Sequence, residues 1–199
     1  PKKSFFTFFY VFNKQTIKLK NNKILLNYHY LKNKSVDIPT HYNKFHILIH
    51  WLVVVIILIQ MITGDKIALE FLAIRNQAIN IDGNTSNSQI HMLGGLFIIL
   101  LMAIRVFLRI KFGVPAPTKK TNDPLKFLST FVHLGIYLIL FAIPITGLLA
   151  FSTINVNLGI AHKILVNILY LFVIIHLIGV AFHQIFLGDN IMERITSWK

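Results

Sequence analysis

The sequence predicts an all-α integral membrane protein, built as a bundle of four helices that each cross the bilayer. Hydrophobic residues make up 55% of the 199 residues and charged residues only 14%, and the mean hydropathy is +0.64. A soluble domain carries fewer apolar and more charged residues. Four apolar segments are also long enough to span, because about 20 helical residues cross the roughly 30 Å hydrocarbon core.

Three connections of different character separate these segments. A polar connection covers Gly64–Ser88, one with prolines covers Lys111–Lys126, and a very short one covers Ser152–Asn157. The short connection predicts that the third and fourth segments form a tight antiparallel hairpin, and Pro144 predicts a kink in the third. The expected spans run approximately over His46–Thr63, Gln89–Ile110, Phe127–Phe151 and Leu158–Leu187.

Positive charge is unevenly distributed along the chain, which has 20 Lys and Arg against 7 acidic residues. Lys and Arg near the ends of spans stay on the cytoplasmic side, or on the matrix side of a mitochondrion. The connection between the second and third segments is rich in them, whereas the first connection carries both signs. Both termini are therefore expected on the inner side, with membrane lipid rather than nucleic acid as the partner of this charge. The inner cations are Arg105, Arg109, Lys111, Lys119, Lys120 and Lys126.

Residues 1–41 form a basic amino-terminal extension ahead of a transmembrane domain over 42–195, and 196–199 form a tail. The stretch Pro1–Val36 has eight lysines and no acid, and its apolar patch Phe5–Phe12 is too short to span. The extension either lies on anionic lipid or a partner subunit, or is an organellar targeting sequence. This second reading slightly favours a mitochondrial inner membrane over a bacterial cytoplasmic membrane.

Histidine has to carry any metal chemistry, because the chain has nine histidines and no cysteine. That excludes disulfides, iron–sulfur clusters and thiolate ligands. An ionisable side chain inside a bilayer is costly, so it is usually paired, ligating or lining a pathway. His162 and His176 are fourteen residues apart, about 40° short of four full turns, and project from nearly one helix face about 21 Å apart along the axis. This spacing suits two haems, one in each leaflet.

Suitable partners occur at both depths. His91 starts its span on the outer side with His162, and His50 lies on the inner half of the first span with His176 on the inner half of the fourth. Iron held by two imidazoles has no open position for oxygen, which favours electron transfer. Taken singly, His46, His133 and His183 are better read as hydrogen-bonded structural or interfacial residues.

Other residues fit a haem pair and also have simpler explanations. Gly94 and Gly95 allow a porphyrin to approach the backbone, or equally a neighbouring helix. Arg105 and Arg109 stand at the inner end of the second span, where they suit haem propionates or snorkelling to the surface. Trp51 is expected as an anchor at the membrane interface.

Several stretches together resemble the bacterial-type cytochrome b561 proteins, a group of four-helix di-haem b cytochromes. They cover about Tyr42–Ile195 in the family's order and are "HILIHWLVVV", "IHMLGGLFIILLMAIRVFLRIKFGVPAP", "HLGIYLILFAIPITGLL", "AHKILVNILYLFVIIHLIGVAFH" and "FLGDNIMERI". The resemblance implies two non-covalent b haems, ligated by His50 with His176 and by His91 with His162. It also implies electron exchange with membrane quinol, near His183, His46 or the arginines.

Two functions from different classes are expected. The first is a quinol-linked electron-transfer oxidoreductase of the respiratory chain in an energy-transducing inner membrane. The second is a haem-containing structural or accessory subunit of a larger respiratory complex, or a homodimer, with little turnover of its own. The connection between the third and fourth spans is shorter than is typical of the family, and the basic extension precedes the first span, which both favour docking to other subunits. The chain has no glycine-rich nucleotide-binding loop, so a soluble donor would be a separate protein.

Overall fold

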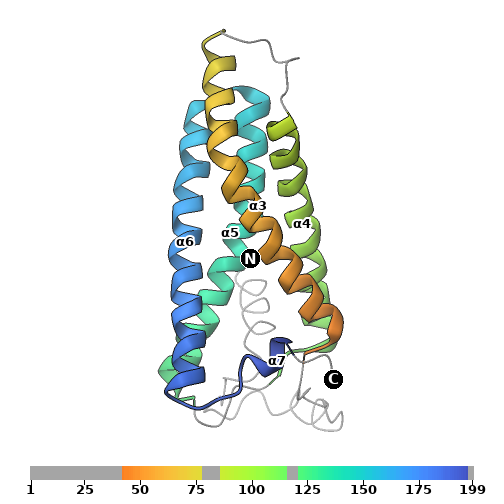
Figure 1. The fold of residues 1–199 in the computed structure, drawn as a ribbon, viewed down its shortest axis with the longest axis vertical. Helices are drawn as coiled ribbons and strands as arrows, with labels where there is room; N and C mark the ends of the chain where they lie inside the picture. The colour runs from red at the N-terminus through yellow and green to blue at the C-terminus, as the bar shows by residue number, and fades with distance from the viewer. Residues whose placement is uncertain (1–41, 78–85, 116–120, 197–199) are drawn as a thin grey trace, which may run out of the picture.

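The computed structural model describes residues 42–77, 86–115 and 121–196, and over them the chain is all-α (Figure 1). Four long helices are each apolar and long enough to cross a membrane, which confirms the expected number of spans within these residues. The extension over 1–41 and the last residues of the tail lie outside the described ranges. The helices are α3 (Lys44–Arg75), α4 (Ser86–Phe112), α5 (Asp123–Thr153), α6 (Val156–Ile185) and the short α7 (Glu193–Thr196).

Asparagine side chains cap the amino-terminal ends of three of the long helices. Asn43 accepts from the backbone N–H of Phe45 at 2.9 Å, and Asn122 accepts from that of Leu125 at 3.1 Å. Asn155 accepts from two N–H groups at the start of α6. Each cap satisfies donors that have no partner within the helix, and so fixes where that helix begins.

The first span is longer than the sequence indicated, and the expected end at Thr63 is wrong. α3 continues through the polar residues Gly64, Asp65 and Lys66 to Arg75, where Asn76 caps it. The stretch after Gly64 contains no proline, and its apolar residues recur with helical spacing, with Ile74 buried. Glycine and charge lower the hydropathy here without breaking the helix, so a hydropathy reading ends the span too early.

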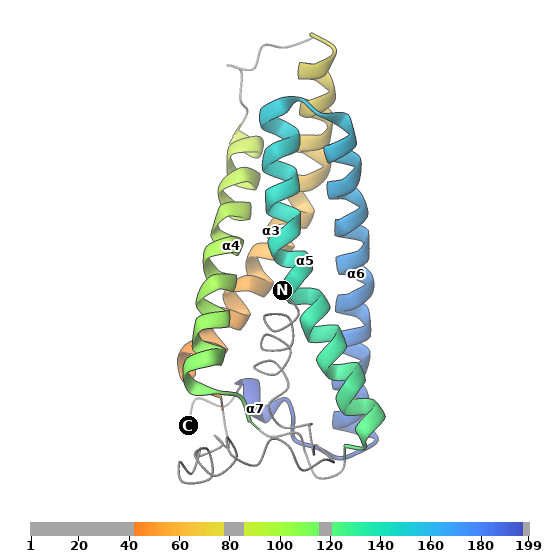
Figure 2. The same cartoon turned by 180° about the vertical axis from the view of Figure 1, so that it is seen from behind.

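The expected hairpin of the third and fourth spans is confirmed. α5 and α6 pack along each other, as do α3 and α4, and the turn between α5 and α6 is made by Ile154 in the left-handed conformation at φ 51°. Pro144 lies inside α5, and Figure 2 shows that α5 changes direction part-way along its length. Proline supplies no N–H to the preceding turn, which is the ordinary cause of such a bend.

The apolar core is small, and most large hydrophobic side chains face outwards. Leu169 is the one residue of α6 that is buried. Exposed apolar surface on this scale is incompatible with water and suits lipid. The core cluster consists of Val53, Ile98, Leu101, Met102, Tyr137, Leu140 and Leu169.

α7 folds back across the end of the bundle where α3 begins and α6 ends (Figure 1). Trp51 donates its indole N–H to the Ile195 carbonyl at 3.1 Å. His183 Nδ1 lies 3.0 Å from a carboxylate oxygen of the buried Asp189. These two contacts tie the segment after α6 to the bundle, so Trp51 holds protein backbone in addition to any interfacial role.

Candidate functional site

Two of the predicted site histidines meet in the half of the bundle near the α5–α6 turn. His91 comes from the first turns of α4 and His162 from those of α6, and their ring centroids are 6.3 Å apart in an edge-to-face arrangement. Both side chains are partly buried. The structure therefore brings together the pair that was expected at the outer depth.

Both rings are held through their Nδ1 atoms. His162 Nδ1 lies 2.9 Å from the Ile143 carbonyl, which only accepts, so His162 donates an N–H there. His91 Nδ1 lies 3.0 Å from Thr63 Oγ1. A ring that donates from Nδ1 keeps a lone pair on its other nitrogen, Nε2, and can offer that lone pair to a metal.

The spacing of this pair fits an axial haem site. With metal–imidazole bonds of about 2 Å, two rings on one metal have centroids roughly 6 Å apart. The separation of 6.3 Å agrees with that, and the hydrogen bond described for each ring is made at Nδ1 rather than at Nε2. Nearby, Gln60 Nε2 is buried without a hydrogen-bond partner among the described residues. The residues present therefore fit a bis-histidine haem at this depth.

Gly147 on α5 makes room for the His162 ring. A Cβ at this position would fall 2.9 Å from both Nδ1 and Cε1 of His162. Contacts that short force the ring to move, and the ring is anchored to the carbonyl of Ile143 one turn away. Only glycine at residue 147 accommodates the ring in its present position.

Replacing Gly147 with alanine is expected to weaken retention of a haem at the outer pair by roughly tenfold, because displacing a ligand's hydrogen-bonded orientation typically costs 10–100-fold in affinity. Haem content per chain after detergent washing measures the loss. Gly179→Ala on α6 is the matched control, since a Cβ there meets nothing within 4 Å. Equal haem retention in both variants would contradict the role assigned to Gly147.

The opposite half of the bundle gathers three histidines. His176 on α6 and His133 on α5 have ring centroids 5.0 Å apart, and His50 on α3 lies near both. His133 Nδ1 donates to the Ser129 carbonyl at 2.6 Å. The direct ring contact of His176 is thus with His133, a residue that the sequence indicated only as structural or interfacial.

The hydrogen bond at Nδ1 of His50 has the opposite direction from the one at Nδ1 of His162. Arg105 Nη1 lies 2.7 Å from His50 Nδ1, and Arg105 Nε donates to the Tyr137 hydroxyl at 3.3 Å. Guanidinium only donates, so His50 Nδ1 accepts, and the proton of the neutral ring sits on Nε2. As arranged here, His50 does not present a free Nε2 lone pair to a metal, and it would do so only if Arg105 released Nδ1.

The other predicted site residues have separate surroundings. His46 is buried at the start of α3, edge-on to Tyr42 at 5.7 Å, with Nδ1 unpartnered among the described residues. Burial raises the pKa of Tyr42, so its phenol stays protonated. His183 pairs with Asp189. A Cβ on Gly94 would overlap the Gln60 amide of α3, so the close approach at this glycine is made by a neighbouring helix.

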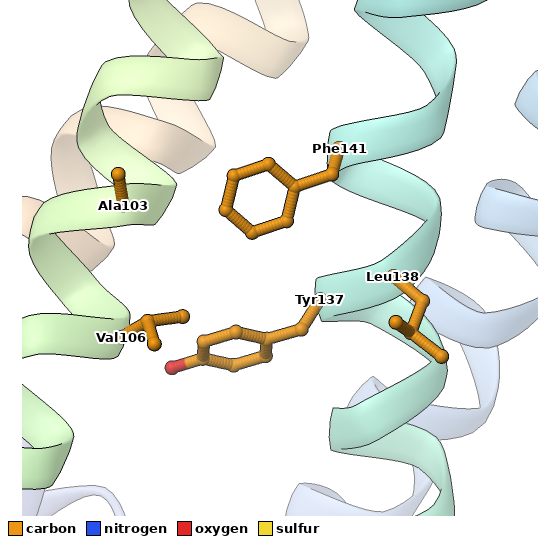
Figure 3. A pocket seen from close by; sticks show the side chains of 5 residues that line it. All are labelled: Ala103, Val106, Tyr137, Leu138 and Phe141. Atoms are coloured by element: carbon orange, nitrogen blue, oxygen red, sulfur yellow. The ribbon is translucent and has the colours of Figure 1, made fainter. Parts of the chain in front are cut away.

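A pocket of about 390 Å³ lies between α4 and α5, near the His50 end. Figure 3 shows Tyr137 and Phe141 reaching from α5 towards Ala103 and Val106 of α4. Leu138 completes the lining, and the Tyr137 hydroxyl, which accepts from Arg105, is the polar group on this otherwise apolar wall. The pocket is therefore linked through one guanidinium to His50.

Comparison with known families decides the class of the protein. The family model of the prokaryotic cytochrome b561 proteins matches residues 41–198, which is most of the chain. The chain belongs to the prokaryotic cytochrome b561 family. It is therefore a membrane b561-type cytochrome with an electron-transfer role, and membership implies two b haems. The resemblance noted in the sequence is confirmed.

Two relatives align with this cytochrome b561 chain over most of its length and nearly all of their own. The cytochrome b562 of Cereibacter sphaeroides is 23% identical over 77% of this chain and 94% of its own length. The probable superoxide oxidase CybB of Yersinia pestis is 26% identical over 79% of this chain and 97% of its own length. The family and both relatives are prokaryotic, so they give no support to the preference for a mitochondrial membrane.

The sequence did not indicate three residues that shape these sites, Thr63, Gly147 and Tyr137, or the ring contact of His133 with His176. Thr63 and Gly147 carry no chemistry that marks them in an apolar run, since their effect depends on a contact with another helix. Gly147 follows Pro144 by three residues in "PITG". A proline and a glycine this close together within a span could have indicated a close contact with a neighbouring helix. The contact of His133 with His176 depends on the local course of α5.

Proposed function

We propose that this chain is a transmembrane di-haem b cytochrome that passes single electrons, taken from membrane quinol, through two bis-histidine haems. The outer haem is held by His91 with His162, and the inner haem by His50 with His176. The observation that carries the proposal is the outer pair, with centroids 6.3 Å apart and both Nδ1 atoms hydrogen-bonded. When bound, the haems supply one-electron chemistry that no side chain of this protein can provide.

At the inner end of the bundle, the side chains suit the negatively charged propionates of a haem as well as its iron. Arg105 and Arg109 are one helical turn apart on α4, and guanidinium groups with this spacing suit the two propionates of a haem. Transfer of the Arg105 donors from His50 to a propionate would free His50 Nδ1 to carry a proton, and Nε2 to act as ligand. His133 contacts His176 and holds its ring edge. His46 and His183 remain candidates for the lining of a quinone site.

The α4–α5 pocket supports quinol as the reductant. It is apolar along Ala103, Val106 and Phe141, which suits a ring with an isoprenoid tail, and it lies between two helices that face lipid. Its Tyr137 hydroxyl can hydrogen-bond a quinol oxygen. Tyr137 and His50 both contact Arg105 in the described structure, so a ring in this pocket would lie close to the proposed inner ligand.

Orientation follows from charge in this proposal. The end of the bundle that carries Arg109, Lys111 and Lys126 faces the inner side, as do both termini. The membrane is energy-transducing, and the prokaryotic relatives favour the cytoplasmic membrane of a bacterium. The protein acts with the quinone pool, and either as a homodimer or with other respiratory subunits.

A reduction experiment tests the proposal on the purified chain. Reduced-minus-oxidised spectra should give a b-type signal of two haems per chain, and a short-chain ubiquinol or menaquinol should reduce them. Superoxide is tried as a second donor, because one relative is named a superoxide oxidase. Haem that no quinol reduces would overturn quinol oxidation and favour the haem-containing structural subunit. A chain without haem would overturn both.

A further inference from the structure

Thr63 lies on α3, a helix that contributes neither ligand of the outer pair. Its side chain is buried, and its Oγ1 is 3.0 Å from the Ile59 carbonyl of the preceding turn. The same Oγ1 is 3.0 Å from His91 Nδ1 on α4. One hydroxyl therefore connects the backbone of α3 to the ring of a proposed haem ligand.

The direction of each hydrogen bond follows from the atoms available. A threonine hydroxyl has one hydrogen, and the Ile59 carbonyl can only accept, so that hydrogen is directed to the backbone. With that hydrogen bonded to Ile59, the hydroxyl offers a lone pair to His91, and we assign the proton of the ring to Nδ1. The ring is left with an unprotonated Nε2, which is the tautomer that binds iron.

We propose that Thr63 is a positioning residue that fixes the tautomer of His91 and increases its electron donation, and thereby lowers the midpoint potential of the outer haem. The inference rests on the proposed ligation of that haem by His91 and His162. A ring that donates from Nδ1 to an acceptor becomes a more basic ligand at Nε2. A more basic ligand stabilises ferric over ferrous iron, so the hydrogen bond from His91 to Thr63 favours the oxidised state.

The inner histidine provides a contrast within the same molecule. His50 Nδ1 accepts from the Arg105 guanidinium at 2.7 Å, whereas His91 Nδ1 donates to Thr63. His162 also donates from Nδ1, to the Ile143 carbonyl. The hydrogen bonds donated by His91 and His162 would both lower the midpoint potential of the outer haem. The acceptor for His162 is a backbone carbonyl, whereas the acceptor for His91 is the side chain of Thr63, which a substitution can remove.

Potentiometric titration of the full haem-loaded chain tests the inference. Thr63→Val keeps the shape but removes the acceptor, and it is expected to weaken the preference for ferric iron about tenfold, which is a rise of about 59 mV for one electron. The component that His162→Ala removes identifies the outer haem. Thr63→Ser keeps a hydroxyl and should restore the unmodified potential. The ferric low-spin resonance should also move in Thr63→Val and return in Thr63→Ser.

Thr130→Val is the matched control, because Thr130 makes the same bond to the carbonyl four residues earlier, with Lys126 at 2.9 Å, in the other half of the bundle. It should leave the outer potential unchanged. If Thr63→Val does not accumulate, Thr63→Ala compared with Thr63→Ser gives the same contrast. An unshifted outer potential in the variants without the hydroxyl, in a chain that keeps both haems, overturns the inference alone. Absence of an outer haem from the unmodified chain overturns the proposed ligation instead.

Discussion

Replacing His162 with alanine is expected to reduce the haem content from two per chain to one. In the proposed scheme His91 and His162 would both bind the iron of the outer haem, and His162→Ala would remove one of these two protein ligands and so weaken retention of the haem. His176→Ala should also leave one haem, but the one that His162→Ala removes. Haem per chain from a pyridine haemochrome assay gives the number, and potentiometric titration shows which component is lost.

His183→Ala serves as the control, because His183 faces Asp189 rather than another histidine ring, and it should keep two haems.

The partner of His176 in the inner haem is decided by comparing His50→Ala with His133→Ala. Loss of the inner haem in the first and its retention in the second agree with ligation by His50. The reverse result would assign the ligand to His133, whose ring touches His176. Two haems in His162→Ala, or loss of one and the same component in both α6 variants, would refute the pairing.

Arg105→Met is expected to lower the midpoint potential of the inner haem. A ferrous haem carries one positive charge fewer than a ferric one, so a nearby cation stabilises the reduced state, and its loss favours oxidation. A unit charge several ångströms away at an effective dielectric constant of about 20 contributes on the order of 2 kcal/mol, which corresponds to roughly 80 mV for one electron. Redox titration of the purified variant measures the shift, and quinol-driven reduction of the inner haem should slow with it.

Two further variants separate charge from hydrogen bonding. Lys111→Met removes one positive charge from the same end of α4, where Lys111 is exposed and lies over Phe107 and Phe112, and it should shift the potential little. Arg105→Lys keeps the charge but loses the paired contacts with Tyr137 and His50, so it should retain most of the potential. An inner potential that is equal in Arg105→Met and in the unmodified chain would exclude an electrostatic role for Arg105.

Features that repeat along a helix could be read directly from the residues. The fourteen-residue interval between His162 and His176 fixes one face of α6, and the depths of the spans place His91 opposite His162. The number of spans and the hairpin of α5 and α6 follow from hydropathy and from a connection too short for any other path. These properties depend on one helix or on two consecutive helices, for which spacing is sufficient information.

Features that depend on contacts between separate helices could not be read in this way. The hydroxyl of Thr63 reaches His91 from a neighbouring helix, and the bare backbone at Gly147 accommodates a ring from α6. The state of His50 depends on Arg105, which is 55 residues further along the chain. Hydropathy also ended α3 at Thr63, because Gly64, Asp65 and Lys66 look like a loop when their helical neighbours are not considered.

The hydrogen bond between Trp51 and Ile195 couples the carboxyl-terminal segment to the residue next to His50. A change in the position of Ile195 would therefore be felt at Trp51, which is the residue next to the proposed haem ligand His50. An affinity tag or a fusion partner attached after Ile195, or a truncation before it, would therefore alter the surroundings of the proposed inner haem, as a substitution near His50 would. Spectra recorded on such derivatives would then describe the attachment as much as the cytochrome.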